Sequence, residues 1–274
     1  MFADDIKIFT SVSSIDDCHR LQVSLRSIYD WCGWNSMKLN IKKCHAISFH
    51  RSAGYIHFEY SLDGSSLERA YSTRDLGVIL SANLSPNDHI DSIINKASRM
   101  LGFVIRTSRR GLSIEAMKTV YVSLVRSVLE FGSVVWSPYQ LGQIQRLQRI
   151  QDRFVRVVGV RLGFEYLDVP VRAVEEFLGL NPLIVRRQLH DLTFLQRVLV
   201  GDLDCPALLR LINIRLPGRT CSADFFCRPS CSTNHELNSV IPRLHKLGNL
   251  VSANYDFFYD STSSLRTLFL SLEN

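Results

Sequence analysis

The chain opens with Met1-Phe2-Ala3-Asp4-Asp5-Ile6-Lys7-Ile8-Phe9, in which two adjacent carboxylates stand between apolar residues. The alternation of apolar and polar residues after the pair is typical of a half-buried strand. Two neighbouring carboxylates repel each other unless a cation lies beside them. Mg²⁺ prefers carboxylate oxygen and keeps its other positions for water and phosphate. The stretch therefore predicts a short strand over residues 6–9 that begins beside a magnesium site, with an ordinary exposed turn as the alternative.

Further short motifs follow this opening in a fixed order. They are Asp17-Cys18, Leu21-Gln22, Trp31-Cys32, Lys38-Leu39-Asn40, Lys43-Cys44, Arg74-Asp75-Leu76-Gly77-Val78, His89-Ile90, Lys96-Ala97, Leu101-Gly102-Phe103, Leu124-Val125-Arg126, Leu129-Glu130-Phe131 and Val135-Trp136-Ser137-Pro138. Together with the Phe-Ala-Asp-Asp opening, they resemble the downstream half of the reverse transcriptase of non-LTR (LINE-type) retrotransposons, particularly the jockey-like group. The resemblance covers nearly the whole chain and weakens towards its C-terminal end.

The resemblance implies an RNA-directed DNA polymerase that copies RNA into DNA by two-metal nucleotidyl transfer. Its partners would be an RNA template and a DNA primer, and its cofactor would be Mg²⁺, as two ions. Asp4 and Asp5 would be catalytic residues and metal ligands, and Lys43 would lie near the incoming nucleotide as a further catalytic residue. Leu76-Gly77-Val78 would belong to the primer grip, the hairpin that holds the end of the growing strand. From chemistry alone, the alternatives are a surface lysine for Lys43 and a plain core strand for residues 76–80.

In the resembled family, another metal-binding aspartate lies on a strand upstream of the pair. Because Asp4 and Asp5 supply only one side of the two-metal clamp, we expect this chain to be inactive as a polymerase by itself. Two alternatives stand beside this expectation. One is a non-catalytic nucleic-acid-binding module that retains its basic helices, and the other is a decayed retrotransposon relic.

The pattern of apolar residues, together with the resemblance, predicts an α+β fold: the C-terminal part of a right-hand polymerase palm, followed by an all-α thumb-like bundle and a helical tail. Residues 1–84 form the partial palm, with a helix over residues 14–34, strands over 38–49, 55–60, 67–71 and 76–80 in a small antiparallel sheet, and a hairpin turn at Asp63-Gly64. Residues 85–162 form the basic bundle, with helices that begin near Ser85, Ser113 and Gly142. Residues 163–215 add further helices that begin near residues 170, 182 and 205, and residues 216–274 form an irregular C-terminal tail.

Positive charge is concentrated in the predicted bundle. Residues 99–161 contain ten arginines and one lysine against three carboxylates, a local net charge of +8 in a chain of net charge +6. This density favours a polyanion partner, and arginine binds phosphate through its bidentate fork. A solvated helical surface is the alternative. The candidate nucleic-acid-binding residues are Arg106, Arg109, Arg110, Arg146, Arg149, Arg153 and Arg156, of which the last four form one ladder along a helix.

Composition narrows the class of protein further. Hydrophobic residues make up 46% and charged residues 21% of the chain, which is typical of a globular protein. Seven cysteines without a disulfide-framework spacing favour a reducing compartment, and those of the tail do not match the usual zinc pairs. We find no signal peptide and no apolar run long enough to span a bilayer. The expected location is intracellular, in the nucleus or the cytoplasm, with no membrane and no evident protein partner.

Overall fold

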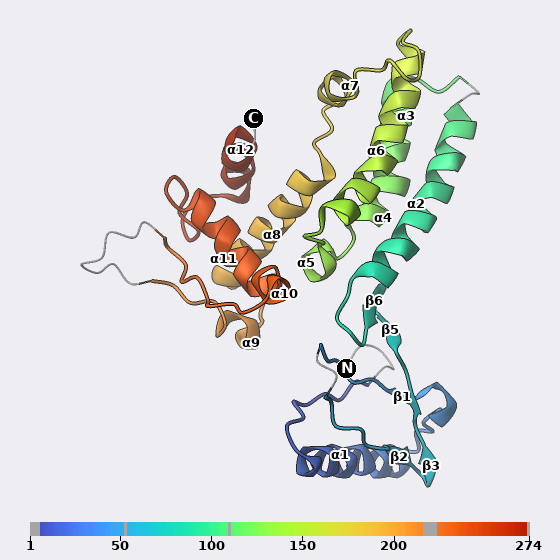
Figure 1. The fold of residues 1–274 in the computed structure, drawn as a ribbon, viewed down its shortest axis with the longest axis vertical. Helices are drawn as coiled ribbons and strands as arrows, with labels where there is room; N and C mark the ends of the chain where they lie inside the picture. Colours follow the sequence, from blue (N-terminus) through green and yellow to red (C-terminus); the bar gives the residue numbers. More distant parts are fainter. Residues whose placement is uncertain (1–5, 52–53, 109–110, 216–223, 273–274) are drawn as a thin grey trace. The chain divides into compact units, whose positions relative to one another are not determined.

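A computed structural model describes residues 6–51, 54–108, 111–215 and 224–272 of the chain (Figure 1). The chain divides into two compact units, residues 1–88 and 89–274. About 56% of the residues are helical and the sheets are small, so the predicted α+β class is confirmed. The division after Asp88 lies close to the predicted boundary after residue 84. The three parts predicted beyond that boundary belong to one unit.

The first unit contains helix α1 (Ile15–Trp34), whose bounds match the predicted helix. A capping box specifies its start, because the hydroxyl of Ser14 accepts a hydrogen bond from the amide of Asp17. In return, the Asp17 carboxylate accepts hydrogen bonds from the amides of Ser13 and Ser14, each at 2.9 Å. These backbone bonds lower the pKa of Asp17 to about 2.

The strands of the described part of this unit form three two-stranded sheets. β1 (His45–Ala46) pairs in parallel with β4 (Glu68–Arg69), β2 (Ser61–Leu62) pairs antiparallel with β3 (Ser65–Ser66), and β5 (Ser72–Asp75) pairs antiparallel with β6 (Val78–Ser81). Asp63 and Gly64 connect β2 to β3, both with positive φ (49° and 73°), as a tight hairpin requires. The predicted turn at Asp63-Gly64 is therefore confirmed.

The predicted strands are wrong in extent, and the single antiparallel sheet is wrong as well. Residues 6–12 and 54–60 form no strand, residues 38–49 contain a 3₁₀ turn, η1 (Ile41–Lys43), and the two residues of β1, and residues 67–71 contain only β4. Side chains occupy backbone groups that a ladder would need. Arg69 donates to the carbonyl oxygen of Phe58 at 2.6 Å, and the amide of Gln22 bonds both the N–H and the carbonyl of Ser61. A backbone satisfied in this way has less need of a partner strand.

The second unit begins with the helices that were predicted as the bundle. They are α2 (Asn87–Ser108, whose first two residues belong to the first unit), α3 (Ile114–Tyr121), the π-helical turn η2 (Val122–Arg126), α4 (Ser127–Glu130), α5 (Ser133–Trp136) and α6 (Leu141–Arg161). The three predicted helices are confirmed, and η2 interrupts the second of them. The hydroxyls of Ser123 and Ser127 donate to the carbonyls four residues earlier, a type of bond that distorts helices.

A buried contact between α3 and α6 forms the centre of the bundle. The ring of Tyr121 stacks on that of Phe154, with centroids 4.1 Å apart, and both side chains are fully buried. The Tyr121 hydroxyl donates to Oε1 of Gln151 at 3.0 Å, and the Gln151 amide donates to Glu175 at 3.0 Å. Burial raises the pKa values of Tyr121 and Glu175. The aromatic pair thus supplies apolar contact, while the side-chain amide of Gln151 forms hydrogen bonds with the Tyr121 hydroxyl and the Glu175 carboxylate.

Beyond α6 the chain continues as α7 (Val171–Phe177), α8 (Leu183–Leu199) and the short α9 (Pro206–Leu209). The predicted starts near residues 170, 182 and 205 are confirmed, because proline at or before the first turn is a strong helix signal. Contacts between α6 and α7, α6 and α8, and α5 and α8 join these helices to the bundle.

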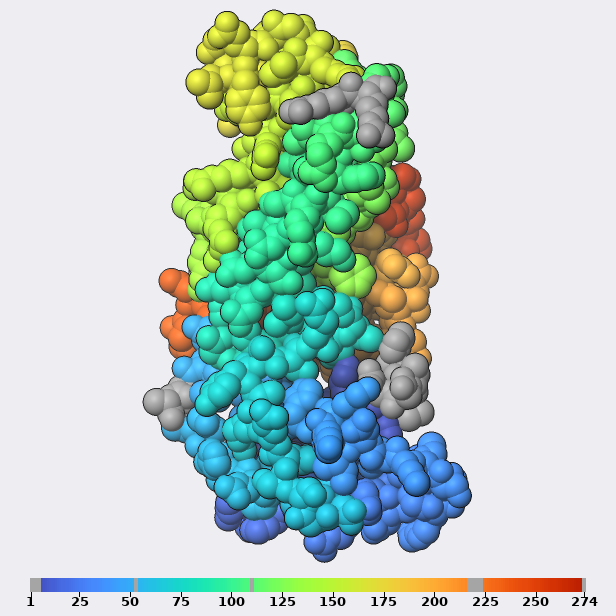
Figure 2. Space-filling model, turned by 90° about the vertical axis from the view of Figure 1, so that its right-hand side faces the viewer, coloured from blue at the N-terminus to red at the C-terminus, as the bar shows by residue number. Residues whose placement is uncertain are grey.

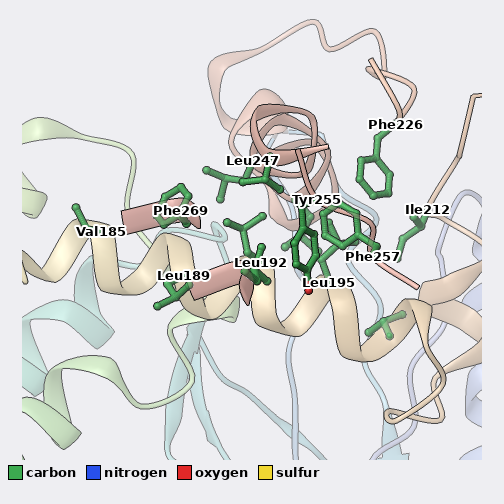
Figure 3. Packing of buried hydrophobic residues seen from close by; sticks show 14 residues of the cluster. Val185, Leu189, Leu192, Leu195, Ile212, Phe226, Leu247, Tyr255, Phe257 and Phe269 are labelled. Atoms are coloured by element: carbon green, nitrogen blue, oxygen red, sulfur yellow. The ribbon is translucent and has the colours of Figure 1, made fainter. Parts of the chain in front are cut away.

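The predicted irregular tail is wrong, because its described part, residues 224–272, contains three helices. They are α10 (Asn234–Leu237), α11 (Val240–Val251) and α12 (Thr262–Leu272). Buried apolar residues of α8, α11 and α12 form one hydrophobic cluster, which Figure 3 shows together with Phe226 and Phe257 from the connecting segments. Polar Ser, Asn and Pro residues surround the apolar positions in the sequence and conceal their helical spacing.

A close approach at Gly248 holds this cluster together. A Cβ at this position of α11 would collide with the ring of Phe226 and press against Leu195 of α8. Phe226 has 0% of its surface exposed and its ring stacks on that of His245, with centroids 5.4 Å apart. Glycine is therefore required here by packing, since any side chain would displace a buried aromatic ring.

His245 makes the stability of the cluster sensitive to pH. It is 1% exposed, its Nδ1 lies 2.7 Å from the carbonyl oxygen of Cys227, and its Nε2 has no partner among the described residues. Burial lowers its pKa below the ordinary 6.5, against the smaller opposing effect of the Cys227 bond. The neutral ring is thus the form that the folded state favours.

We expect the free energy of unfolding to fall as the pH decreases from about 7 to about 5. The contribution of His245 is fully present above the unfolded pKa of 6.5 and is lost progressively as the pH falls from there through the lower pKa of the folded state, with a slope of at most about 1.4 kcal/mol per pH unit for one proton. His245→Gln keeps a donor for Cys227 but does not titrate. Denaturant unfolding at several pH values should show a weaker pH dependence in this variant; equal dependence in both proteins would refute the assignment.

Candidate nucleic-acid interface

The predicted metal and catalytic residues are only partly within the described structure. Asp4 and Asp5 lie outside the described residues. Lys43 is exposed and ends the 3₁₀ turn η1, where its amide donates to the carbonyl of Asn40 at 2.9 Å. Across the described ranges, no group of three or more His, Cys, Asp or Glu side chains could hold a metal ion. The magnesium site therefore rests on the sequence of the Asp4-Asp5 pair.

The predicted primer-grip residues form the end of the β5–β6 hairpin. Leu76 and Gly77 are the two turn residues, with φ of 45° and 92°, and Val78 begins β6. The strand predicted over residues 76–80 is thus wrong at its start, because Leu76-Gly77 reverses the chain. Leu76 is 58% exposed whereas Val78 is 7% exposed. A leucine in the left-handed region is strained, and here it places an apolar side chain in solvent at the tip of the hairpin.

The predicted arginine ladder lies on one face of α6, opposite the buried residues of that helix. Its two ends are engaged within the protein. Arg146 forms an ion pair with Asp91 of α2 at 2.7 Å and donates to Gln143 at 2.9 Å. Arg156 donates to the carbonyl oxygens of Tyr166 and Leu167 at 2.9 and 3.2 Å, and its guanidinium lies 5.8 Å from the centroid of the Tyr166 ring. These two arginines therefore stabilise the fold.

The two middle arginines of the ladder are different. Arg149 and Arg153 are exposed, and neither side chain has a hydrogen-bond or ion-pair partner among the described residues. They are four residues apart on the helix, so their side chains are neighbours on its surface. Like charges at this spacing destabilise a helix by about 0.2–0.5 kcal/mol. Arg149 and Arg153 thus form an exposed, uncompensated positive pair.

Contacts at corresponding ends hold α2 beside α6. Arg146 near the start of α6 pairs with Asp91 near the start of α2, and Arg161 at the end of α6 donates to the carbonyl oxygen of Ser108 at the end of α2. The two helices therefore run parallel. Arg161 also donates to the carbonyl of Leu112. The ladder motif did not include Arg161, which is exposed but donates to backbone carbonyl oxygens at the end of α2 and after it.

Helix α2, drawn in blue-green in Figure 2, exposes part of its surface. Its predicted Arg106 is exposed, and so are Lys96 and Arg99 of the same helix, which the prediction missed although helical spacing from Arg106 would have found them. Arg109 and Arg110 lie outside the described residues. No contact between described residues joins Arg106 to Arg149 or Arg153. The predicted nucleic-acid-binding arginines therefore do not form one cluster in the described structure.

Comparison of the chain with protein-family models, curated proteins and solved structures finds no match. Within the ranges that the structure describes, the helices all lack the length and hydropathy that a membrane-spanning segment needs.

Proposed function

We propose that this chain binds nucleic acid through the phosphate backbone, as the thumb-like part of a reverse transcriptase, and that Arg149 and Arg153 of α6 make the principal contacts. The observation that carries the proposal is the contrast within one ladder. Arg146 and Arg156 have partners in the fold, whereas Arg149 and Arg153 are exposed without one. Neither guanidinium group has an ion-pair partner among the described residues, so both are free to pair with a polyanion that lies along the helix.

The proposed contacts are to phosphate and not to bases. Arginines on the exposed face of a helix neutralise phosphates and release the counterions bound to the nucleic acid. These contacts give affinity without sequence preference. The resemblance supports an RNA template and a DNA primer as the natural partners, with Arg106, Arg109 and Arg110 as further contacts. It also supports Mg²⁺ chemistry at Asp4 and Asp5 with Lys43 nearby. The proposal concerns binding, and catalysis is outside it.

The proposal predicts a specific loss of affinity. Arg149→Ala/Arg153→Ala should weaken binding to an RNA–DNA hybrid and to duplex DNA by a similar factor, since each loses two phosphate contacts. The effect should be equal for unrelated sequences. Fluorescence anisotropy with labelled duplexes of two sequences measures both the loss and its sequence independence.

The matched control is Arg197→Ala/Arg210→Ala, which removes the same charge from exposed arginines of α8 and its following segment. This variant should keep most of the affinity. Equal losses in the two double variants would show that only net charge matters, and an unchanged affinity of Arg149→Ala/Arg153→Ala would refute the interface and favour a relic without activity.

A further inference from the structure

A second group of arginines lies inside the unit formed by residues 89–274, apart from the ladder. It consists of four guanidinium groups from η2, α8 and α11 and two carboxylates from α4 and α8. We call it the buried arginine cluster; its members are Arg126, Arg186, Arg187, Arg243, Glu130 and Asp191. Four positive charges therefore face two negative charges in a region with little exposure to water.

Both carboxylates of the cluster already have arginine partners. Glu130 accepts two hydrogen bonds from Arg186, from Nε and, at 2.8 Å, from Nη2, and it lies 3.9 Å from Nε of Arg126. Asp191 is 1% exposed and accepts from Nε and Nη2 of Arg243 at 2.7 and 3.2 Å. The same Nη2 donates to the carbonyl oxygen of Val134 at 2.6 Å.

Arg187 is left without a partner. It is 1% exposed, and none of its Nε, Nη1 and Nη2 atoms has a hydrogen-bond acceptor among the described residues. Its helix places it one turn before Asp191, but Asp191 is occupied by Arg243. Burying an ion without hydrogen bonds costs several kcal/mol, so native proteins rarely leave a guanidinium in this state.

Among the described residues, the carboxylates that act electrostatically on Arg187 are Glu130 and Asp191, and both already have arginine partners. Its neighbour His190 has its Nε2 4.0 Å from Glu130 and its Nδ1 3.3 Å from the hydroxyl of Ser133. Burial lowers the pKa of His190, which keeps the ring neutral at pH 7. The cluster therefore retains an excess of two positive charges, and water bound to Arg187 would satisfy its N–H groups without balancing that charge.

We infer that the buried arginine cluster binds a small phosphate-type oxyanion on the guanidinium of Arg187. The planar fork of arginine matches two oxygens of such an anion, and an oxyanion supplies both the acceptors and the negative charge that the cluster lacks. Of the side chains around Glu130, that of His190 is 37% exposed, whereas those of Arg126 and Arg186 are 17% and 15% exposed. This site is independent of the interface proposed on α6.

The test is thermal unfolding of the full chain in inorganic phosphate, against sodium chloride at equal ionic strength. For the wild type, Tm should rise by about 5–10 °C when phosphate reaches a hundredfold excess over Kd. Arg187→Met, which keeps a similar volume, should show no phosphate-dependent rise. The control Arg197→Met removes an exposed arginine of the same helix and should respond like the wild type, and so should Arg149→Ala/Arg153→Ala.

The phosphate-dependent shift is the readout, so a change in the baseline stability of Arg187→Met does not affect the result. Calorimetric titration of phosphate into the folded protein gives an independent measure, with heat of binding expected for the wild type and none for Arg187→Met. The inference is overturned if phosphate and chloride act equally on the wild type, or if Arg187→Met responds to phosphate as the wild type does. Loss of the response in Arg149→Ala/Arg153→Ala would place the anion on α6 instead.

Discussion

Replacement of Phe226 by alanine is expected to reduce the stability of the α8–α11–α12 cluster by about 3–5 kcal/mol. The side chain is 0% exposed, and its ring makes edge contacts with Phe225 and Phe257 and a stacked contact with His245. The ring also fills the space in front of Gly248. Removing the ring leaves a cavity, and three separate segments of the chain would have to move to close it. Core substitutions whose cavity cannot close cause the largest losses of stability.

Hydrogen exchange of the amides in α8 and α11 measures this loss directly, because exchange reports the free energy of opening for each segment. The control is Phe258→Ala, which removes the same ring from a neighbouring position that is 48% exposed. Its effect should stay within about 0.5 kcal/mol. Similar protection in Phe226→Ala and in the wild type would contradict the packing described for the C-terminal helices.

Replacement of Asp191 by alanine should have an effect of comparable size, about 3–5 kcal/mol. Asp191 is 1% exposed and is the bidentate partner of Arg243. Its removal would leave Glu130 as the one carboxylate, among the described residues, that acts on Arg187, and Arg243 would lose its ion-pair partner. Breaking a buried pair by deleting one member is strongly destabilising because the remaining charge stays uncompensated.

Arg187→Met is the variant with which the stability of Asp191→Ala should be compared. Deleting the carboxylate should destabilise the fold, whereas deleting the unpaired guanidinium, measured without phosphate, should be neutral or stabilising. Asp204→Ala, at an exposed position after α8, is the control and should change little. Denaturant unfolding monitored at helix α8 separates the three variants. A loss of stability in Arg187→Met as large as that in Asp191→Ala would mean that Arg187 has a partner in the fold.

The helices could be predicted from the sequence because their signals are local. Ser14 and Asp17 form a capping box within four residues, and Pro182 marks the start of α8. The bounds of the strands could not be predicted in this way, because contacts with distant residues limit them: β1 pairs with the distant β4, and the side chain of Gln22 binds the backbone of Ser61. The helices of the tail were missed for another reason: polar residues are interspersed in this part of the sequence, and the burial of Phe226 is visible only from its contacts with Gly248 and His245 of α11 and with Phe257.

The candidate interface shows a similar limit. Helical spacing alone predicted that Arg146, Arg149, Arg153 and Arg156 share one face of α6, and this is confirmed. Spacing could not show that Arg146 pairs with Asp91, a residue on another helix, or that Arg156 bonds the backbone of a following loop. Of the four predicted arginines, only Arg149 and Arg153 are therefore exposed without a partner among the described residues. The absence of partners around Arg187 is equally invisible in the sequence.

The central claim is that Arg149 and Arg153 contact phosphates, and the salt dependence of binding tests it most directly. The logarithm of the association constant for a B-form duplex falls linearly with the logarithm of salt concentration, by about 0.9 per phosphate contact. Arg149→Ala/Arg153→Ala should therefore reduce the magnitude of the slope by roughly 1.8 relative to the wild type, while Arg197→Ala/Arg210→Ala leaves it unchanged. A slope for Arg149→Ala/Arg153→Ala equal to that of the wild type would contradict the account.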